Sequence, residues 1–454
     1  MVKEKFVQVV NKLILPLFVG STIIGEAESS ARDSEIAYGK QNSLWIKPNK
    51  NEEYRLCLKR GRAFQPYEVL LLKNIFKEID EIDTLNLQNP NYEHTLQERA
   101  IEKAMCEVVS GSASETMLGI ITELEKWSYR TYEGKKINFG IVIDTSADEE
   151  NSPYLHYSKI IEQDFFVLLS DGKKSYVEFN RNGFFKGCTT LEKLRNYATI
   201  APNEFDNIAK YCGDKRIGIV LTENGDLLIF KNRTLMFAKR KNHWNIYSHE
   251  EVIQLLSYRS SQSIKDVRRS VYMTALDCSY NYSGGILVYL KKDMVDDALV
   301  HISSKDILTE DHFELKKAKV IFDASENEDV KKIMEVTNYY AGTFEDFLQR
   351  NNCVKTMALR KLIAGKKFYE LTRKLREDLV ALDGALIIDY DGTIVAAGAI
   401  LKIEAGSSGG GGRLAATRSL AKYGVTIKVS QDGMMQGFCN DKKQNGIKQL
   451  FIVN

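Results

Sequence analysis

The spacing of apolar residues divides the first half of the chain into helical and strand-like stretches. Apolar side chains recur every three or four positions over 66–82 (PYEVLLLKNIFKEIDEI) and 95–111 (TLQERAIEKAMCEVVSG), which predicts two amphipathic helices. Before them, NSLWIKPNKNEEYRLCLKRG (42–61) is polar and strand-like. We therefore expect the region from about Pro66 to Glu133 to be mainly helical.

Short β-branched and aromatic runs joined by turn residues follow. INFGIVIDTS (137–146) predicts one strand, and DFFVLLSDGKKSYVEFNRNGFF (164–185) predicts three strands joined at Asp-Gly and Asn-Gly turns. RIGIVLTENGDLLIFKNRTLMFAKRKNHWNIY (216–247) is the plainest meander, with Asn-Gly and Lys-Asn at its joints. This part of the chain predicts antiparallel hairpins.

Helices and apolar strands alternate in the second half. Two helices are expected within 248–279, and GGILVYLKK (284–292) predicts a buried strand. A long helical stretch covers 355–382, with a break expected at Gly365. Further strands are predicted at VIFDAS (320–325), in a hairpin over 383–403 that turns at Asp391-Gly392, in a hairpin over 425–438, and in the terminal KQLFIVN.

This alternation predicts an α/β fold in which a mixed sheet carries helices on its faces. We expect that sheet in a C-terminal domain at 249–454, preceded by an α+β region with a β-meander at 136–248 and a mostly helical region at 1–135. Ligands in such folds bind at loops beyond the strand ends, which is where Asp383 and the glycine run at 409–412 fall.

The apolar opening of the chain has two interpretations. KEKFVQVVNKLILPLFVGSTIIGEAESSA (3–31) combines lysines, an apolar stretch and small residues, which imitates a signal peptide. Asn11, Lys12 and Pro16 interrupt the apolar run, and the remaining apolar residues follow helical spacing. We expect a docked amphipathic helix, with a cleaved signal as the alternative.

Composition and charge limit the classes of partner and cofactor that we expect for this chain. The formal net charge is only +2, so no overall basic field indicates nucleic acid, and no other stretch approaches the length of a membrane span. The seven cysteines are scattered and form no CxxC pair, which favours reduced thiols in the cytoplasm and argues against zinc. All six histidines precede residue 313, so the last third of the chain has no histidine chemistry of its own.

Three short segments of the last quarter together carry candidate chemistry. LDGALIID places Asp383 at the start of a strand, SSGGGGRLAATR supplies backbone donors and an arginine before a helix, and KVSQDG ends a strand beside a turn. Carboxylate, phosphate cradle, arginine and hydroxyl are the parts that a nucleotide site needs. The candidate binding residues are Asp383, Gly384, Ala385, Gly410, Gly411, Gly412, Arg413, Thr417, Arg418, Ser430 and Asp432.

In this order the segments resemble the diadenylate cyclase domain over roughly 250–440. That family carries D-G-A at a strand, then G-T-R-H-R leading into a helix, then a V-S-E-E-type strand end. Here D-G-A is intact at 383–385, but the loop is Gly411-Gly412-Arg413-Leu414-Ala415, so only the first arginine of R-H-R is kept. Ser430 and an acid at Asp432 keep the last motif in part.

The altered loop changes the expected function. Loss of one preorganised donor at developing charge costs about 3 kcal/mol in the transition state, whereas ground-state binding suffers less. The segment from Gly411 to Gly433 is particularly like the degraded class called DACNV, which implies a sensor for a nucleotide or cyclic dinucleotide in bacterial stress or anti-phage signalling. The resemblance also implies an unidentified effector protein and a homodimer.

Two alternatives stay open. An active diadenylate cyclase would make cyclic di-AMP from two ATP, with Mg²⁺ or Mn²⁺ bound at Asp383, and Arg418 would replace one lost phosphate contact. An assembly protein would have kept the fold for its surfaces alone.

Overall fold

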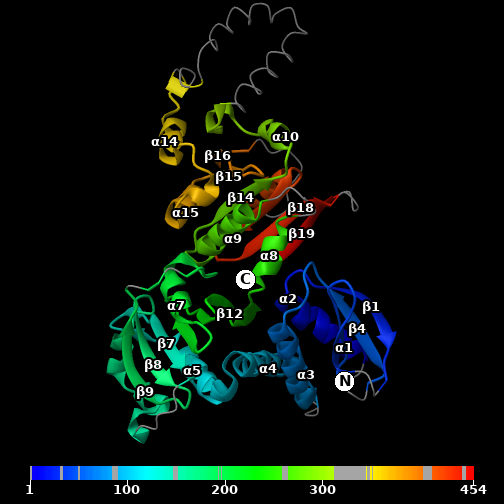
Figure 1. Cartoon of the computed structure of the whole chain (residues 1–454), viewed down its shortest axis with the longest axis vertical. Coiled ribbons are helices and arrows are strands. Elements are labelled where there is room, and N and C mark those ends of the chain that lie inside the picture. The colour runs from blue at the N-terminus through cyan, green and yellow to red at the C-terminus, as the bar shows by residue number, and fades with distance from the viewer. Residues whose placement is uncertain are drawn as a thin grey trace, which may run out of the picture. The chain divides into compact units, whose positions relative to one another are not determined.

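The computed structural model describes residues 3–30, 34–49, 52–83, 90–146, 152–192, 194–195, 197–257, 264–310, 344, 348–349, 351–401, 412–441 and 446–453. Contacts between residues divide the chain into two compact units, Met1–Glu251 and Val252–Asn454, and Figure 1 labels many of their helices and strands. Within the described ranges, every helix is too short or too polar to cross a bilayer.

The apolar opening of the chain forms the helical segment that its spacing predicts. Helix α1 (Lys3–Val9) continues into a π-helical turn, η1 (Val10–Ile14), and ends in α2 (Leu15–Leu17). Phe6 is fully buried, and its ring centroid lies 5.5 Å from that of Phe76. The apolar face of this segment therefore belongs to the core of the first unit.

A four-stranded antiparallel sheet follows, in the order β1-β4-β3-β2. Its strands are β1 (Thr22–Glu28), β2 (Ile36–Tyr38), β3 (Ser43–Ile46) and β4 (Tyr54–Lys59). Strands β3 and β4 lie in the segment expected to be strand-like, whereas no pattern indicated β1 or β2.

The helical region is confirmed. It contains α3 (Pro66–Asp83), α4 (Pro90–Ser110) and α5 (Ser114–Trp127), with a 3₁₀ turn, η2 (Gly111–Ala113), between the last two. Two short strands, β5 (Thr131–Tyr132) and β6 (Lys135–Lys136), form a hairpin after α5.

The predicted meander is part of a seven-stranded sheet in the order β13-β12-β11-β10-β7-β8-β9. All neighbouring strands are antiparallel except β7 and β8, which are parallel. The strands are β7 (Phe139–Asp144), β8 (Ser175–Asn180), β9 (Phe185–Thr190), β10 (Arg216–Leu221), β11 (Leu227–Lys231), β12 (Thr234–Arg240) and β13 (His243–Ile246). Short helices α6 (Tyr157–Ile160) and α7 (Asp206–Tyr211) lie in the connections.

One predicted strand is wrong. The start of 164–185 forms a 3₁₀ helix, η4 (Asp164–Leu169), instead of a strand. Phe166 is fully buried there, whereas Phe165 and Leu168 are 57% and 65% exposed. An unbroken apolar run does not by itself distinguish a strand from a helical turn, because both can leave some apolar residues exposed.

One apolar core runs through the first unit. It includes Phe6 at the start of the chain, Met117 of α5, Phe139 of β7 and Ile246 at the end of β13. Elements of the expected 1–135 and 136–248 regions therefore share a core.

The second unit is built on a six-stranded sheet in the order β16-β15-β14-β17-β18-β19. Strands β14 and β15 are parallel, and the other neighbours are antiparallel. The strands are β14 (Gly285–Leu290), β15 (Ala385–Ile388), β16 (Ile394–Ala399), β17 (Gly424–Val429), β18 (Met435–Asp441) and β19 (Gly446–Val453). Both predicted hairpins and the last strand are thereby confirmed.

Helices cover both faces of this sheet. They include α9 (Lys265–Tyr280), α10 (Val295–Leu299), α14 (Val354–Ile363), α15 (Arg373–Ala381) and α16 (Gly412–Leu420), and α8 (His249–Leu255) spans the division between the units. Val288 of β14 shares an apolar core with Leu420 of α16, whereas a Cβ atom at Gly285 would contact Val380 of α15. The chain is thus a mixed α/β protein with helix-flanked mixed sheets.

The expected break in the long helical stretch is present. Helix α14 ends at Ile363, the next residue, Ala364, has a left-handed backbone (φ 47°), and Gly365 follows with φ 73°. The chain then passes through a 3₁₀ turn, η7 (Phe368–Glu370), into α15. The predicted strand at 320–325 and the glycines at 409–411 lie outside the described residues.

Candidate functional site

Three strand ends meet at one end of the six-stranded sheet. Ile286 of β14 pairs with Ala385 of the parallel strand β15, and Gly285 pairs with Val429 of the antiparallel strand β17. The start of β14, the start of β15 and the end of β17 therefore lie at the same edge of the sheet. This topology gathers the D-G-A segment and the Ser-Gln-Asp-Gly turn around Gly284.

Arg413 lies against Gly284. A Cβ atom on Gly284 would lie 2.6 Å from Arg413 Nη1 and 3.0 Å from Gln431 Cγ, so a side chain at this glycine would collide with both. Arg413 comes from the first turn of α16 and is exposed. No carboxylate among the described residues forms an ion pair with its guanidinium, which leaves it available to an anion.

The hairpin turn beside Arg413 is held by its own backbone. Gly433 N donates to Ser430 O at 2.9 Å, and Ser430 N donates to Met434 O at 2.9 Å. Lys428 Nζ donates to the Ser430 hydroxyl at 2.9 Å, which brings a second cation to this edge. Asp432 is exposed at the tip of the turn.

The D-G-A segment has a packing role that needs no ligand. Gly384 has φ 115°, and a Cβ atom there would lie 2.5 Å from the carbonyl carbon of Gly398 in β16. Only glycine fits this close approach of two backbones. Ala385 is buried, whereas Asp383 is exposed. Asp383 stands two residues before Ala385 and Gly284 stands two residues before Ile286, its partner in the parallel pair, so the two residues lie at the same end of the sheet.

The remaining predicted residues differ in whether their side chains can reach a ligand at this edge. The Thr417 hydroxyl is buried and donates to Arg413 O at 2.7 Å, within its own helix. Arg418 is exposed but lies five positions after Arg413, about 140° around the helix at 3.6 residues per turn. Gly412 begins α16, and Gly410 and Gly411 fall outside the described residues.

A buried ion pair anchors the helices behind this edge. Arg373 Nε of α15 donates to Asp277 Oδ2 of α9 at 3.0 Å, and Asp277 is almost fully buried. Burial lowers the pKa of the neighbouring Arg376 to about 10, with the charge of Arg373 acting in the same direction and that of Asp277 opposing it. Ser279 of α9 donates to Gly433 O, which fixes the turn to the same helix. The predicted site therefore rests on a rigid frame.

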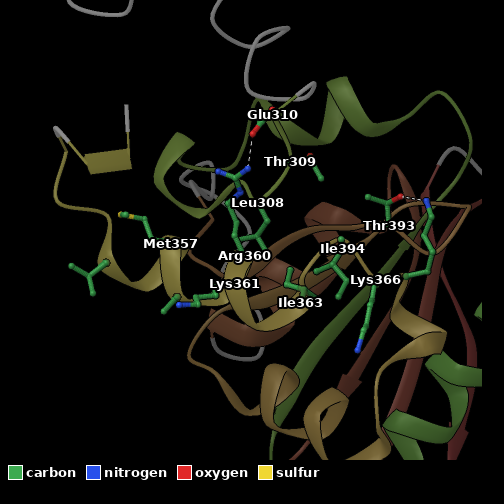
Figure 2. A pocket seen from close by; sticks show the side chains of 14 residues that line it. Leu308, Thr309, Glu310, Met357, Arg360, Lys361, Ile363, Lys366, Thr393 and Ile394 are labelled. Atoms are coloured by element: carbon green, nitrogen blue, oxygen red, sulfur yellow. Dashed lines mark hydrogen bonds and ion pairs between the residues drawn. The ribbon is translucent and has the colours of Figure 1, made fainter. Parts of the chain in front are cut away.

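A separate cavity of about 960 Å³ lies at the opposite end of the sheet (Figure 2). Ile394 of β16 lines it and pairs with the far end of β15, away from Asp383. Two of its cations are already neutralised, since Arg360 Nη2 lies 2.6 Å from Glu310 and Lys367 Nζ lies 2.6 Å from Asp391. Lys361 and Lys366 also line the cavity and form no ion pair with a described residue. The edge at Arg413 is the stronger candidate for a nucleotide because the motifs of the sequence also meet there.

The structure places Asp383 in no cluster of metal-binding side chains among the described residues. Within the part of the chain that the structure describes, the one group of three or more adjacent metal-binding side chains lies in the first unit and excludes Asp383. Comparisons of the chain with protein-family models, with curated proteins and with solved structures find no match. The likeness to diadenylate cyclases therefore depends on the motifs alone.

Proposed function

We propose that the edge of the six-stranded sheet at Gly284 binds the phosphate groups of a nucleotide or cyclic dinucleotide, and that the protein acts as a sensor of that ligand. The observation that carries the proposal is the position of Arg413. Its guanidinium lies over a glycine, beside a hairpin turn, with no described carboxylate paired to it. Guanidinium groups in such settings bind phosphate through two parallel hydrogen bonds.

The fold of the second unit supports a diadenylate-cyclase-like arrangement. D-G-A stands at the start of a central strand, the arginine begins a helix on the sheet, and the Ser430 turn completes the same edge. A sensor of this kind would act in the cytoplasm in bacterial stress or anti-phage signalling, through a separate effector protein and as a homodimer.

The loop favours binding over catalysis. Leu414 and Ala415 replace the imidazole and the second cation of the family motif, and both are partly buried. Thr417 cannot replace the lost donors, because its hydroxyl already donates a hydrogen bond to Arg413 O within the helix. Turnover requires donors placed at the developing charge, and each missing donor costs a hundredfold or more. The alternative, a cyclase that joins two ATP with Mg²⁺ or Mn²⁺ at Asp383, would depend on Arg418 to replace a lost phosphate contact, although Arg418 lies about 140° around the helix from Arg413.

The first prediction tests the arginine. We expect Arg413→Ala to weaken binding of ATP or cyclic di-AMP to the full-length protein by about 2 kcal/mol, roughly 30-fold in Kd, as for a charge-assisted hydrogen bond. Isothermal titration calorimetry measures this. Lys422→Ala, which removes an exposed cation in the turn after the same helix, is the matched control and should leave Kd unchanged.

The same samples separate the two functions. Incubation with ATP and Mn²⁺ should give no cyclic dinucleotide, while ATP or cyclic di-AMP still binds. A product that disappears in Asp383→Asn would establish the cyclase instead. An equal Kd for Arg413→Ala and the unaltered protein would remove Arg413 from the site. Mass spectrometry of small molecules that co-purify with the protein identifies the cognate nucleotide.

A further inference from the structure

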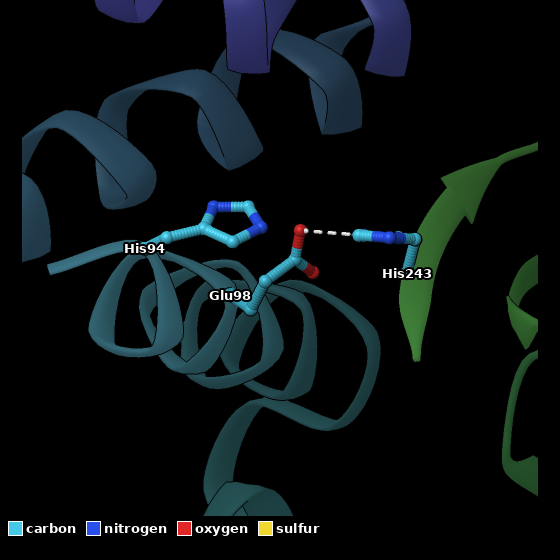
Figure 3. A group of neighbouring side chains, drawn as sticks. All are labelled: His94, Glu98 and His243. Carbon is cyan, nitrogen blue, oxygen red and sulfur yellow. Dashed lines mark hydrogen bonds and ion pairs between the residues drawn. The ribbon is translucent and has the colours of Figure 1, made fainter. Parts of the chain in front are cut away.

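A group of nitrogen and oxygen donors gathers on the first unit, away from any motif of the sequence. His94 and Glu98 stand one turn apart on α4, and His243 is the first residue of β13 (Figure 3). One ligand atom from each of the three side chains lies within 4.8 Å of the others. His243 Nδ1 and Glu98 Oε1 are 3.3 Å apart.

These distances suit a small divalent ion. Zinc bonds to histidine nitrogen and carboxylate oxygen are about 2.0–2.2 Å long, so two ligands of a tetrahedral ion stand about 3.4 Å apart. The Glu98–His243 pair already has this separation. His94 stands one helical turn from Glu98 on the same face, and a small rotation of its side chain would bring its imidazole to the same point.

The carboxylate of Glu98 has an unused oxygen. Glu98 Oε2 is buried and has no hydrogen-bond partner among the described residues, although a buried charged oxygen without a partner is costly. No lysine or arginine of the described chain pairs with Glu98. The nearby cations are neutralised by other acids, since Arg99 Nη2 lies 2.8 Å from Glu125 and Lys239 Nζ lies 3.0 Å from Glu102. A cation at Glu98 would therefore supply a missing partner.

The surrounding structure holds the start of β13, and with it His243, against helix α4. Trp244, next to His243, donates from Nε1 to the buried Glu102 of α4 at 3.2 Å, which fixes the start of β13 against the helix. The turn before His243 has a left-handed backbone at Asn242 (φ 67°), and the Tyr129 hydroxyl donates to Asn242 Oδ1 at 3.4 Å. Such support from neighbouring groups orients metal ligands before the ion arrives.

We propose that His94, Glu98 and His243 bind one divalent transition-metal ion, for which zinc is the best match. Two imidazoles and one carboxylate are a donor set that zinc prefers, and three protein ligands leave a fourth position open. A cavity of about 540 Å³ contains all three residues and is also lined by Arg99, Lys126 and Lys239. Acidic side chains already pair with these three cations, so the fourth position faces a charge-balanced cavity and is available to water or to a small ligand.

The experiment uses tag-free full-length protein that has been stripped with a chelator and then titrated with Co²⁺, whose visible absorption reports coordination, followed by displacement with Zn²⁺. We expect one ion per chain. His243→Asn and the isosteric Glu98→Gln should each weaken binding at least about 100-fold, because loss of even an outer partner costs 10–100-fold. His301→Asn, which changes a histidine of the second unit, is the control and should bind as the unaltered chain does.

Several outcomes would overturn the proposal. Equal affinity in His243→Asn and in the unaltered protein would show that the ion binds elsewhere. Sulfur-to-cobalt charge-transfer absorption would assign the ion to a cysteine, such as the exposed Cys188. Absence of 1:1 binding by a chain with a cooperative thermal transition would refute the site directly. Because His243 is exposed, the metal-free His243→Asn chain should keep the thermal midpoint of the metal-free unaltered protein, which separates lost binding from lost folding.

Discussion

A single buried carboxylate in the second unit gives a pH-dependent prediction. Asp389 follows β15 and is 9% exposed. Burial raises its pKa from 3.8 to about 6, an effect reinforced by the charges of Asp391 and Asp293 and opposed by the Tyr390 amide and by Lys367. A group with a raised folded-state pKa binds a proton more tightly when folded, so stability falls as pH rises from about 4 to 6.

Asp389→Asn should therefore stabilise the protein above pH 6 and have no effect near pH 4. The full shift corresponds to about 3 kcal/mol, and partial contact with solvent reduces the expected gain to about 2 kcal/mol at pH 7.5. The asparagine Oδ1 can still accept the hydrogen bond from Tyr390 N, which the carboxylate accepts at 2.6 Å. Urea unfolding followed by circular dichroism at both pH values measures the difference.

The neighbouring acid provides a control of opposite sign. The pKa of Asp391 is lowered, because the hydrogen bonds and charge of Lys367 together with bonds from Thr393 outweigh the cost of burial. Asp391→Asn should destabilise the protein at pH 7.5 and lose that effect as the pH falls below the carboxylate's ordinary range. If both variants changed stability in the same direction at pH 7.5, the inference that burial raises the pKa of Asp389 and destabilises its charged form would be wrong.

At this scale the sequence indicated which residues carry charge and where the chain turns, but not what each side chain already contacts. Asp383 and Arg413 were predicted from their motifs, and the strand register brings both segments to one edge. The buried hydrogen bond of Thr417 could not be foreseen, because helix burial depends on tertiary packing. His94 and His243 were not predicted as neighbours, since a pair so distant in sequence leaves no spacing signal.

At the scale of elements, hairpins were the most predictable feature. Asn-Gly and Asp-Gly pairs require the left-handed backbone that tight turns use, and Gly225, Gly392 and Gly433 all have positive φ. Elements without such turns were harder to predict. Strand β1 alternates weakly and is largely exposed, so it lacks the pattern of a half-buried strand. The apolar run at 164–169 gave the opposite error. It was predicted to be a strand because it is hydrophobic, although it has no periodicity, and it forms a 3₁₀ helix instead.

The N-terminal helical segment should contribute strongly to the stability of the first unit. Phe6 is fully buried, and its ring centroid lies 5.7 Å from that of Tyr54 and 5.5 Å from that of Phe76. Phe6→Ala should lower the free energy of unfolding by about 3–5 kcal/mol, because it removes apolar contact and leaves a cavity. All three tryptophans (Trp45, Trp127 and Trp244) belong to the first unit, so their fluorescence during urea unfolding reports this change.

Lys12→Ala is the control, since Lys12 is exposed in the same segment and should change stability by less than about 0.5 kcal/mol. A Phe6→Ala chain as stable as the unaltered one would mean that this segment does not pack into the core in solution.

At the scale of the whole molecule, the described residues form an apolar core in each of the two units. One includes Phe139 and the elements of Met1–Glu251, and the other includes Ile387 and the elements of Val252–Asn454. The sequence indicated a change of pattern near 248, where the meander gives way to alternating helices and strands. It did not indicate that the helices of 66–127 and the meander share one core, because that depends on contacts between residues far apart in the chain.

Separate cores predict separate responses to mutation. Ile387→Ala should destabilise the second unit by about 2–5 kcal/mol and leave the tryptophan fluorescence transition unchanged, because no tryptophan lies beyond residue 251. Phe139→Ala should shift that fluorescence transition, since its ring lies 5.1 Å from that of Trp127. Circular dichroism follows both units and should show the effect of either substitution. If Ile387→Ala moved the fluorescence midpoint as far as Phe139→Ala does, the two cores would unfold as one cooperative unit, and the proposed nucleotide site and the proposed metal site would be coupled through global stability.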